Sequence, residues 1–249
     1  MKVLLLFGVF LATLFVGVPS TPAQAAQQEW RWNVDDGKVY GDSDRVVAVN
    51  VRVESALALS PTAAAAEIEA TLGDDRSWIS SEDVAFQVVS TETPELTVTI
   101  ASAATTDRLC LPLNTVGRLS CRRGNQVILN VDRWLNGPDV YHASYDGELD
   151  EYRRYLINHE VGHFLGKGHV GSERCSSAVR APVMMQQTFG LDGCAINGWP
   201  ALDLTAAGPS KEQVQELLSD SGVWDQELRQ VLESMRVAFD KVLRDLGVS

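Results

Sequence analysis

The chain has 249 residues, of which 45% are hydrophobic and 22% are charged, so the composition excludes a disordered polypeptide and suits a soluble globular protein. The formal net charge of −12 leaves no extended basic surface. Nucleic acid and anionic membrane surfaces are therefore not expected as partners. The expected partner is a small molecule or another protein.

The first segment has the pattern of a secretory signal peptide. Lys2 precedes an apolar run over residues 3–18, and small and polar residues follow, including Ala23-Gln24-Ala25. The run is shorter than the roughly 20 apolar residues of a membrane-spanning helix, which is the alternative. We expect residues 1–25 to be removed on secretion, with no membrane insertion afterwards. Because Lys2 is the only charged residue of this segment, the secreted protein would have a net charge of −13.

Runs rich in β-branched residues predict the early strands. The first, VVAVNVRV over residues 46–53, lies between polar turn segments. Ser60-Pro61 is a typical helix start, and residues 63–72 are dense in helix formers, so a helix that ends at Gly73 should follow. Three further strands are predicted at residues 84–89, 96–100 and 126–131.

A longer helix is expected over residues 149–165. Apolar and histidine side chains recur there every three or four residues and therefore share one face of the helix. The members of this face are Leu149, Tyr152, Leu156, His159 and His163. Strands early in the chain and this helix late indicate an α+β fold.

Beyond Trp199-Pro200 the sequence predicts a C-terminal helical extension. Ser210 and Gln213 form a capping box for a short helix, and from Trp224 onward an apolar stripe indicates a second, longer helix. This helix is expected to dock on its own domain. Its near-heptad spacing makes self-association through the stripe the alternative. The expected organisation is a signal peptide over residues 1–25, a domain over 26–200 and the extension over 201–249.

Secretion into an oxidising compartment favours disulfides over free thiols. The four cysteines, Cys110, Cys121, Cys175 and Cys194, allow three pairings. The local pairing, Cys110 with Cys121 and Cys175 with Cys194, closes two short loops, each of which would stabilise the fold by about 3 kcal/mol. Four unpaired core cysteines and a cysteine zinc site are the alternatives, although no C-x-x-C pair supports the zinc site.

Three of the four histidines lie within the segment from His159 to His169. Residues four apart on a helix lie one above the other, so His159 and His163 present their imidazoles toward a common point. Gly166 can adopt the backbone conformation that ends a helix, which allows His169 to supply a third nitrogen. Three neutral nitrogens with one open position are typical of catalytic zinc. We therefore expect one Zn²⁺ ion held by His159, His163 and His169.

Glu160 follows the first of these histidines but lies about 100° away around the helix. It is therefore expected to reach the water on the open coordination position rather than to act as a ligand. A carboxylate in that place can take a proton from the attacking water and pass it to a leaving amine, which is the chemistry of amide hydrolysis. The residues predict a hydrolase with Glu160 as its general base and acid.

The pattern H-E-x-x-H-x-x-G-x-x-H resembles the zinc signature of the metzincin clan of metallopeptidases. Ala181-Pro182-Val183-Met184 is similar to the methionine turn of that clan, with Met185 as the alternative methionine. Over roughly residues 45–200 the chain also resembles a family of secreted actinobacterial proteins classed as a domain of unknown function and suspected to be zincin-like. The further segments that carry this resemblance are Cys121-Arg122-Arg123-Gly124, Asn130-Val131-Asp132-Arg133-Trp134 and Asn197-Gly198-Trp199-Pro200.

The resemblance implies a metzincin-like twisted mixed sheet of five strands, and an active-site helix that carries Glu160 and two of the ligands. An extended peptide would lie in a cleft beside an edge strand, and residues 26–200 would form the catalytic domain. Met184 would support the metal site from below without ligating the ion. Where some members of the clan place a tyrosine after the methionine turn, this chain has Gln186-Gln187-Thr188. A site-shaping role for the loop between Cys175 and Cys194 is a further hypothesis.

The function predicted from these residues is a secreted zinc-dependent endopeptidase of the metzincin type, with protein or peptide substrates. A zinc amidase acting on a cell-wall or other non-protein amide would use the same residues and is the first alternative. The second alternative is a secreted binding or adhesion module that keeps zinc for stability. Glu160 argues against this module, because a structural zinc site needs no general base.

Overall fold

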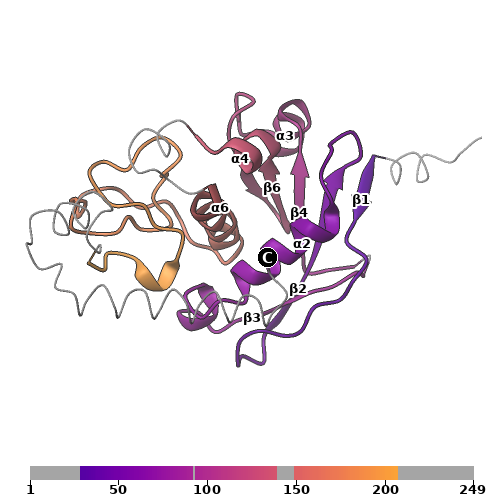
Figure 1. Cartoon of the computed structure of the whole chain (residues 1–249), viewed down its shortest axis with the longest axis horizontal. Coiled ribbons are helices and arrows are strands. Elements are labelled where there is room, and N and C mark those ends of the chain that lie inside the picture. Colours follow the sequence, from indigo (N-terminus) through magenta and orange to yellow (C-terminus); the bar gives the residue numbers. More distant parts are fainter. Residues whose placement is uncertain (1–28, 92, 139–148, 207–249) are drawn as a thin grey trace, which may run out of the picture.

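The computed structural model describes residues 29–91, 93–138 and 149–206. The signal peptide predicted over residues 1–25 and the helices predicted from Ser210 and Trp224 lie outside these residues. The described elements, labelled in Figure 1, are β1 (Trp30–Trp32), β2 (Val46–Glu54), α2 (Pro61–Leu72), the 3-10 helix η1 (Trp78–Ser80), β3 (Ala85–Val88), β4 (Leu96–Ala101), α3 (Ala103–Cys110), β5 (Cys121–Arg123), β6 (Gln126–Asn130), α4 (Val131–Asn136), α6 (Leu149–Phe164) and the 3-10 helix η2 (Pro200–Leu202).

A mixed sheet of six strands forms the centre of this α/β fold, in the order β1-β2-β4-β6-β5 with β3 also paired to β2. Strands β2, β3, β4 and β6 run parallel, and the outer strands β1 and β5 run antiparallel to their neighbours. Both β1 and β3 pair with β2 along the edge opposite β4, one at each end of that long strand. The six strands therefore occupy five positions across the sheet, because β1 and β3 share one position. The resemblance implied five strands, so the sheet has one strand more than expected.

The two faces of the sheet differ because side chains alternate along each strand. Val51, Val98 and Val127 lie in register and are buried in one core cluster with residues of α2 and α6. On the opposite face, Ile128 packs against the Cys110–Cys121 disulfide at the end of α3. Helices α2 and α6 thus cover one face of the sheet, and α3 covers part of the other.

The sequence predicts the long elements within one or two residues but misses the short ones. Ser60 caps α2 as expected, since its Oγ accepts a hydrogen bond of 3.2 Å from the Ala63 N–H. The strand predicted over residues 126–131 ends at Asn130, because the Asn130 side chain accepts from the Asp132 N–H at 2.9 Å and starts helix α4. The other elements not predicted are β1, β5, α3 and the 3-10 helices η1 and η2, which span three to eight residues each.

Both disulfides have the local pairing, Cys110 with Cys121 and Cys175 with Cys194. The first joins the end of α3 to the start of β5, and the second closes a loop in the segment that follows α6. Two disulfides are consistent with an oxidising, extracellular environment. Among the described residues, every helix is too short or too polar to cross a bilayer.

Helix α6 is the central element of the fold, between the sheet and the long segment over residues 165–206 (Figure 1). This segment has little regular structure, so buried side chains satisfy its backbone. The Asn197 amide donates to the carbonyl oxygens of Ala181 and Trp199, at 2.9 and 3.0 Å. Asn158 of α6 donates to the carbonyl oxygen of Gly198 at 2.8 Å. The segment is thereby held against the helix backbone.

Gly198 lies so close to α6 that any side chain there would displace the segment. A Cβ at this position would lie 2.9 Å from the Tyr155 backbone nitrogen and 3.0 Å from the Glu151 carbonyl oxygen. We expect Gly198→Ala to lower the free energy of unfolding by about 1–3 kcal/mol, measured by urea denaturation. Gly168→Ala is the control, since nothing lies within 4 Å of its Cβ position. Equal stabilities for the two variants would contradict this packing.

Candidate metal centre

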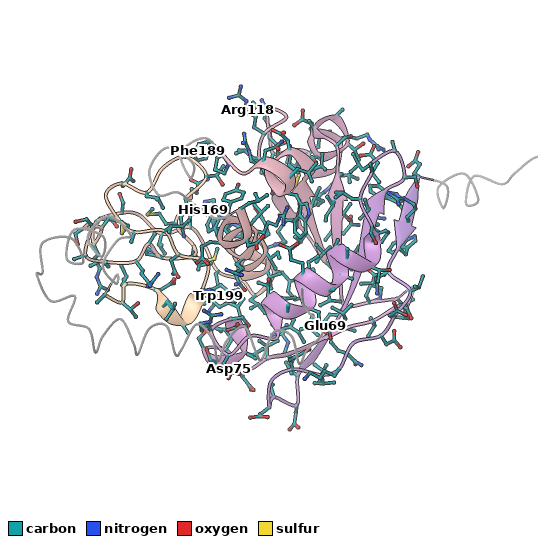
Figure 2. The ribbon with its side chains drawn as sticks, viewed as in Figure 1. Glu69, Asp75, Arg118, His169, Phe189 and Trp199 are labelled. Carbon is teal, nitrogen blue, oxygen red and sulfur yellow. A yellow bond between two sulfur atoms is a disulfide. The ribbon has the colours of Figure 1, made fainter. Side chains whose placement is uncertain are left out.

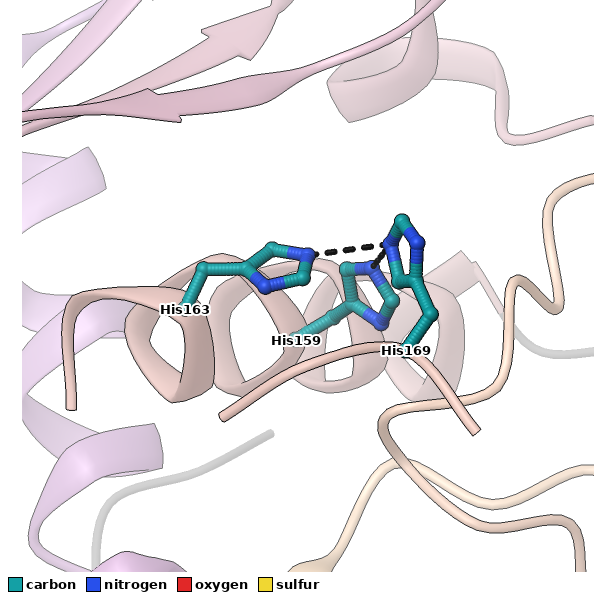
Figure 3. Close-up of side chains that lie close together, drawn as sticks. All are labelled: His159, His163 and His169. Atoms are coloured by element: carbon teal, nitrogen blue, oxygen red, sulfur yellow. Dashed lines mark hydrogen bonds between the residues drawn. The ribbon is translucent and has the colours of Figure 1, made fainter. Parts of the chain in front are cut away.

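Three histidine side chains converge beside α6 (Figure 3). His159 and His163 lie one turn apart on the helix, and His169 approaches from the segment that follows it. The Nε2 atom of His169 lies 3.3 Å from Nε2 of His159 and 3.0 Å from Nε2 of His163. One ring nitrogen of each residue lies within 4.8 Å of the others, so the group could hold a metal ion. The structure brings together the three ligands predicted from the sequence.

Backbone carbonyls set the tautomers of the two helical histidines. Nδ1 of His159 lies 2.8 Å from the Val183 carbonyl oxygen, and Nδ1 of His163 lies 2.8 Å from that of Lys167. A carbonyl oxygen only accepts hydrogen bonds, so each Nδ1 carries the proton and donates. Each Nε2 therefore presents a lone pair toward the common point, which is the arrangement found in metal-binding histidines.

This donor set fits zinc. The Nε2 atom of His169 carries at most one proton, which it can donate to Nε2 of His159 or to Nε2 of His163. When all three rings are neutral, at least one Nε2 lone pair therefore has no donor. Protonation does not relieve this readily, because burial lowers the pKa of His159 to about 3. Burial and the neighbouring His163 also lower the pKa of His169. Three neutral imidazoles that face one point are the ligands of an open zinc site.

The end of α6 places the third histidine. Gly166 has a φ of 87°, which glycine adopts without strain, and the Lys167 N–H donates to the Gly162 carbonyl at 2.9 Å. The chain then reverses, and the Val170 N–H donates to the Met184 carbonyl at 3.1 Å. Gly166 thus ends the helix as the sequence predicts, and His169 returns to face the two helical histidines.

The predicted methionine turn lies against the same helix. A Cβ on Gly162 would lie 2.4 Å from the Met184 sulfur and 2.7 Å from the Trp78 ring, so Met184 packs tightly on α6 at Gly162. Met185, the alternative, belongs to a separate cluster with Cys194. Met184, rather than Met185, is thus the methionine that packs on α6, and Val183 beside it supplies the carbonyl that orients His159.

Asp203 anchors this turn from behind and was not predicted from the sequence. Its Oδ1 accepts from the Val183 N–H at 2.8 Å and from the Asn197 amide at 3.0 Å. The Val183 backbone therefore donates its N–H to Asp203 and accepts through its carbonyl from His159. The sequence offers no local signal for this role, because Asp203 lies 20 residues from Val183.

Glu160 is buried, with 5% of its surface exposed, and it lines the same cavity as the three histidines. Its Oε2 has no hydrogen-bond partner among the residues that the structure describes. Burial raises the pKa of Glu160 to about 8, and the nearby Arg122 opposes this shift. The carboxyl group predicted to move a proton thus lies next to the histidines and retains an unpaired oxygen.

The cavity beside the histidines has a volume of about 390 Å³. Two tyrosines of α6 line it, but their hydroxyls are engaged. Tyr155 donates to the Met185 carbonyl oxygen at 3.2 Å, and the Tyr152 hydroxyl lies 3.1 Å from that of Thr188. Burial raises the pKa of Tyr152 to about 12, so its hydroxyl stays protonated. Arginines 118, 122 and 133 also line the cavity, and sequence reasoning gave them no role.

Zinc binding tests the ligand set. We expect the wild-type chain to retain one zinc ion after dialysis, and His163→Ala and His169→Ala each to weaken zinc binding by at least about 100-fold, since they remove ligands rather than their outer partners. Zinc per chain would be measured by mass spectrometry of the element, with chelator competition for affinity. Glu160→Gln is the control and should retain the ion. Unchanged affinity in His169→Ala would show that His169 is not a ligand.

The stability of the methionine turn should depend on pH through Asp203. Burial raises the pKa of Asp203 to about 7, so the neutral form is favoured in the folded state. Its ionisation therefore removes stability as the pH rises through 7. Asp203→Asn keeps an acceptor oxygen and cannot ionise. We expect the wild type to lose up to about 4 kcal/mol relative to this variant between about pH 4 and pH 8.

Urea unfolding of both chains in chelator measures this difference. Lys167, Glu173 and Arg174 line the hollow that Asp203 faces, and both proteins contain them. A stability difference that stays constant between the two pH values would contradict the prediction.

Comparisons with known proteins bear on the family of this chain. A search of curated proteins gave no match, and a search of solved structures gave none. A family model matches residues 16–234, a range that includes the three histidines, the methionine turn and both disulfides. The chain therefore belongs to the family described as Protein of unknown function (DUF3152).

Proposed function

We propose that this protein is a secreted zinc-dependent endopeptidase of the metzincin type. The observation that carries the proposal is the Glu160 carboxylate, buried with an unpartnered Oε2 in the cavity where three imidazole nitrogens converge. A buried polar atom without a partner costs about 1–3 kcal/mol, and more when it is charged. Among the described residues, no hydrogen bond to Oε2 offsets this cost. The unpaired oxygen therefore supports a chemical role for Glu160.

The residues around the cavity supply complementary parts of a hydrolytic site. His159, His163 and His169 would hold a zinc ion, which supplies a Lewis acid for the substrate carbonyl and a nucleophile near neutral pH. Glu160 accepts a proton from the attacking water and then donates it to the leaving amine nitrogen. Burial, which raises the pKa of Glu160 to about 8, favours the protonated carboxyl that the second step needs.

The edge of the sheet supports a peptide as the substrate. Strand β5 is the last strand in the order of the sheet, and Cys121 and Arg122 of this strand line the cavity beside the histidines. An extended peptide could add to the outer edge of β5, which pairs with no strand of the described residues, and cross the cavity with its main chain beside Glu160. This arrangement favours cleavage within a chain, because the peptide can extend in both directions from the site.

Replacing Glu160 separates metal binding from catalysis. We expect Glu160→Gln to keep its zinc and to lower the cleavage rate by about 10²–10⁴-fold, because the amide cannot accept the proton. Cleavage of a broad peptide library would be followed by terminal-peptide mass spectrometry. Wild-type protein treated with chelator is the control, and cleavages common to all three samples come from a contaminant. No cleavage by the zinc-loaded wild type would contradict the proposal and favour a binding module.

A further inference from the structure

The cavity beside the histidines has a cationic wall in an acidic protein. Arg122 comes from β5, Arg133 from α4 and Arg118 from the turn between α3 and β5, and all three line the cavity. Glu160 is the one carboxylate among the cavity's described lining residues, although the whole chain has a net charge of −12. Figure 2 shows Arg118, Phe189 and His169 on the same side of the molecule. Positive charge is therefore concentrated where the proposed chemistry takes place.

The guanidinium groups of this wall are held by backbone carbonyls. Arg122 donates through Nε to the His163 carbonyl oxygen at 3.1 Å. Arg133 donates through Nε to the Arg118 carbonyl oxygen at 2.8 Å and through Nη1 to that of Gly137 at 3.0 Å. These hydrogen bonds orient the two groups through carbonyl oxygens, which carry no formal charge. Each group also keeps further N–H donors, because a guanidinium has five.

Some other arginines of the fold have carboxylate partners, whereas Arg52 and Arg123 bond to neutral oxygens. Arg76 pairs with Asp74, Arg154 with Glu151, and Arg153 with both Glu67 and Asp150. Within the described ranges, no carboxylate lies within ion-pair distance of the three arginines of the cavity wall. Unpaired but oriented arginines that line a cavity are typical of sites that bind carboxylate or phosphate groups.

We propose that Arg122 and Arg133 bind a carboxylate of the substrate, so that the site selects acidic peptides. The inference rests on the proposed function, which makes the ligand of this cavity a peptide. A carboxylate can accept two parallel hydrogen bonds from one guanidinium, and the site gains affinity for it because the arginine charges are otherwise unpaired. Arg118, which is exposed at the rim, adds to the field that attracts an anionic peptide.

Arg123 provides a matched control one residue away. Successive side chains of a strand point to opposite faces, and Arg123 donates to the Leu109 carbonyl oxygen of α3 at 3.3 Å rather than lining the cavity. Arg123→Gln and Arg122→Gln therefore change the net charge equally. Arg122→Gln removes a guanidinium from the cavity side of β5, and Arg123→Gln removes one from the α3 side.

Peptide binding to the zinc-loaded Glu160→Gln chain tests the proposal without requiring catalysis. The probes are neutral peptides with both termini blocked, in which a single Glu is placed at each position in turn, and their Gln counterparts. A neutral peptide with a free C-terminal carboxylate, compared with its amide, distinguishes a terminal from a side-chain carboxylate. We expect one Glu position or the free terminus to bind about 10–100-fold more tightly than its neutral counterpart.

The arginine variants locate the selectivity. In the Glu160→Gln background, Arg122→Gln and Arg133→Gln should reduce the preference for the carboxylate to about 3-fold or less, and Arg123→Gln should leave it unchanged. Retained zinc and an unchanged melting temperature report that each variant is folded. If Arg133→Gln does not fold, Arg122→Gln alone carries the test. Equal binding of every Glu and Gln pair would overturn the proposal, as would an equal loss in Arg123→Gln.

The two proposals fail separately. If the wild type cleaves peptides but the Glu and Gln probes bind equally, the peptidase assignment stands and the carboxylate site is wrong. If the probes show selectivity that depends on Arg122 and the wild type cleaves nothing, the binding site stands and the peptidase assignment is wrong.

Discussion

Two hydrogen bonds, from imidazole Nδ1 atoms to backbone carbonyls, are the constraint on which the candidate metal centre depends. They fix which nitrogen of His159 and His163 carries the proton, and so leave both Nε2 lone pairs facing His169. The carbonyl of Lys167 is in place because Gly166 ends helix α6, and the carbonyl of Val183 is in place because Asp203 anchors its peptide. The irregular segment after α6 therefore contributes to the candidate centre. The buried Asn197 and the Cys175–Cys194 disulfide cross-link this segment internally, and Asn158 of α6 binds its Gly198 carbonyl.

Burial gives the centre its electrostatic character. Inside the fold burial lowers the pKa values of His159 and His169 and raises that of Glu160, so the neutral forms of these three groups are favoured. A cation among the histidines would satisfy the converging lone pairs and, by the same field, favour the carboxylate that accepts a proton. The arginines on the facing wall extend this positive field across the cavity. An acidic protein thus keeps a cationic site, which is the property that connects the proposed chemistry to the proposed substrate class.

Local spacing explains what could be predicted from the sequence. The three histidines lie within one helix and the turn that follows it, and each disulfide closes a short loop. Rules about neighbouring residues are therefore enough to predict both features. Long elements such as β2 and α6 were also found, whereas the three-residue strands β1 and β5 carry too few residues for a pattern. Asp203, Arg122 and Arg133 reach the site through tertiary contacts with residues distant in the chain. Their roles follow from packing, and no spacing within the sequence indicates them.

The most direct test of the central claim is a crystal structure of the zinc-loaded chain, with anomalous scattering measured on both sides of the zinc absorption edge. We expect one zinc peak, about 2.0–2.1 Å from Nε2 of His159, His163 and His169, with a solvent oxygen as the fourth ligand and Glu160 within hydrogen-bond distance of that oxygen. A peak held by four protein ligands, or by other residues, would contradict the account, because a closed or displaced site leaves no open position beside Glu160.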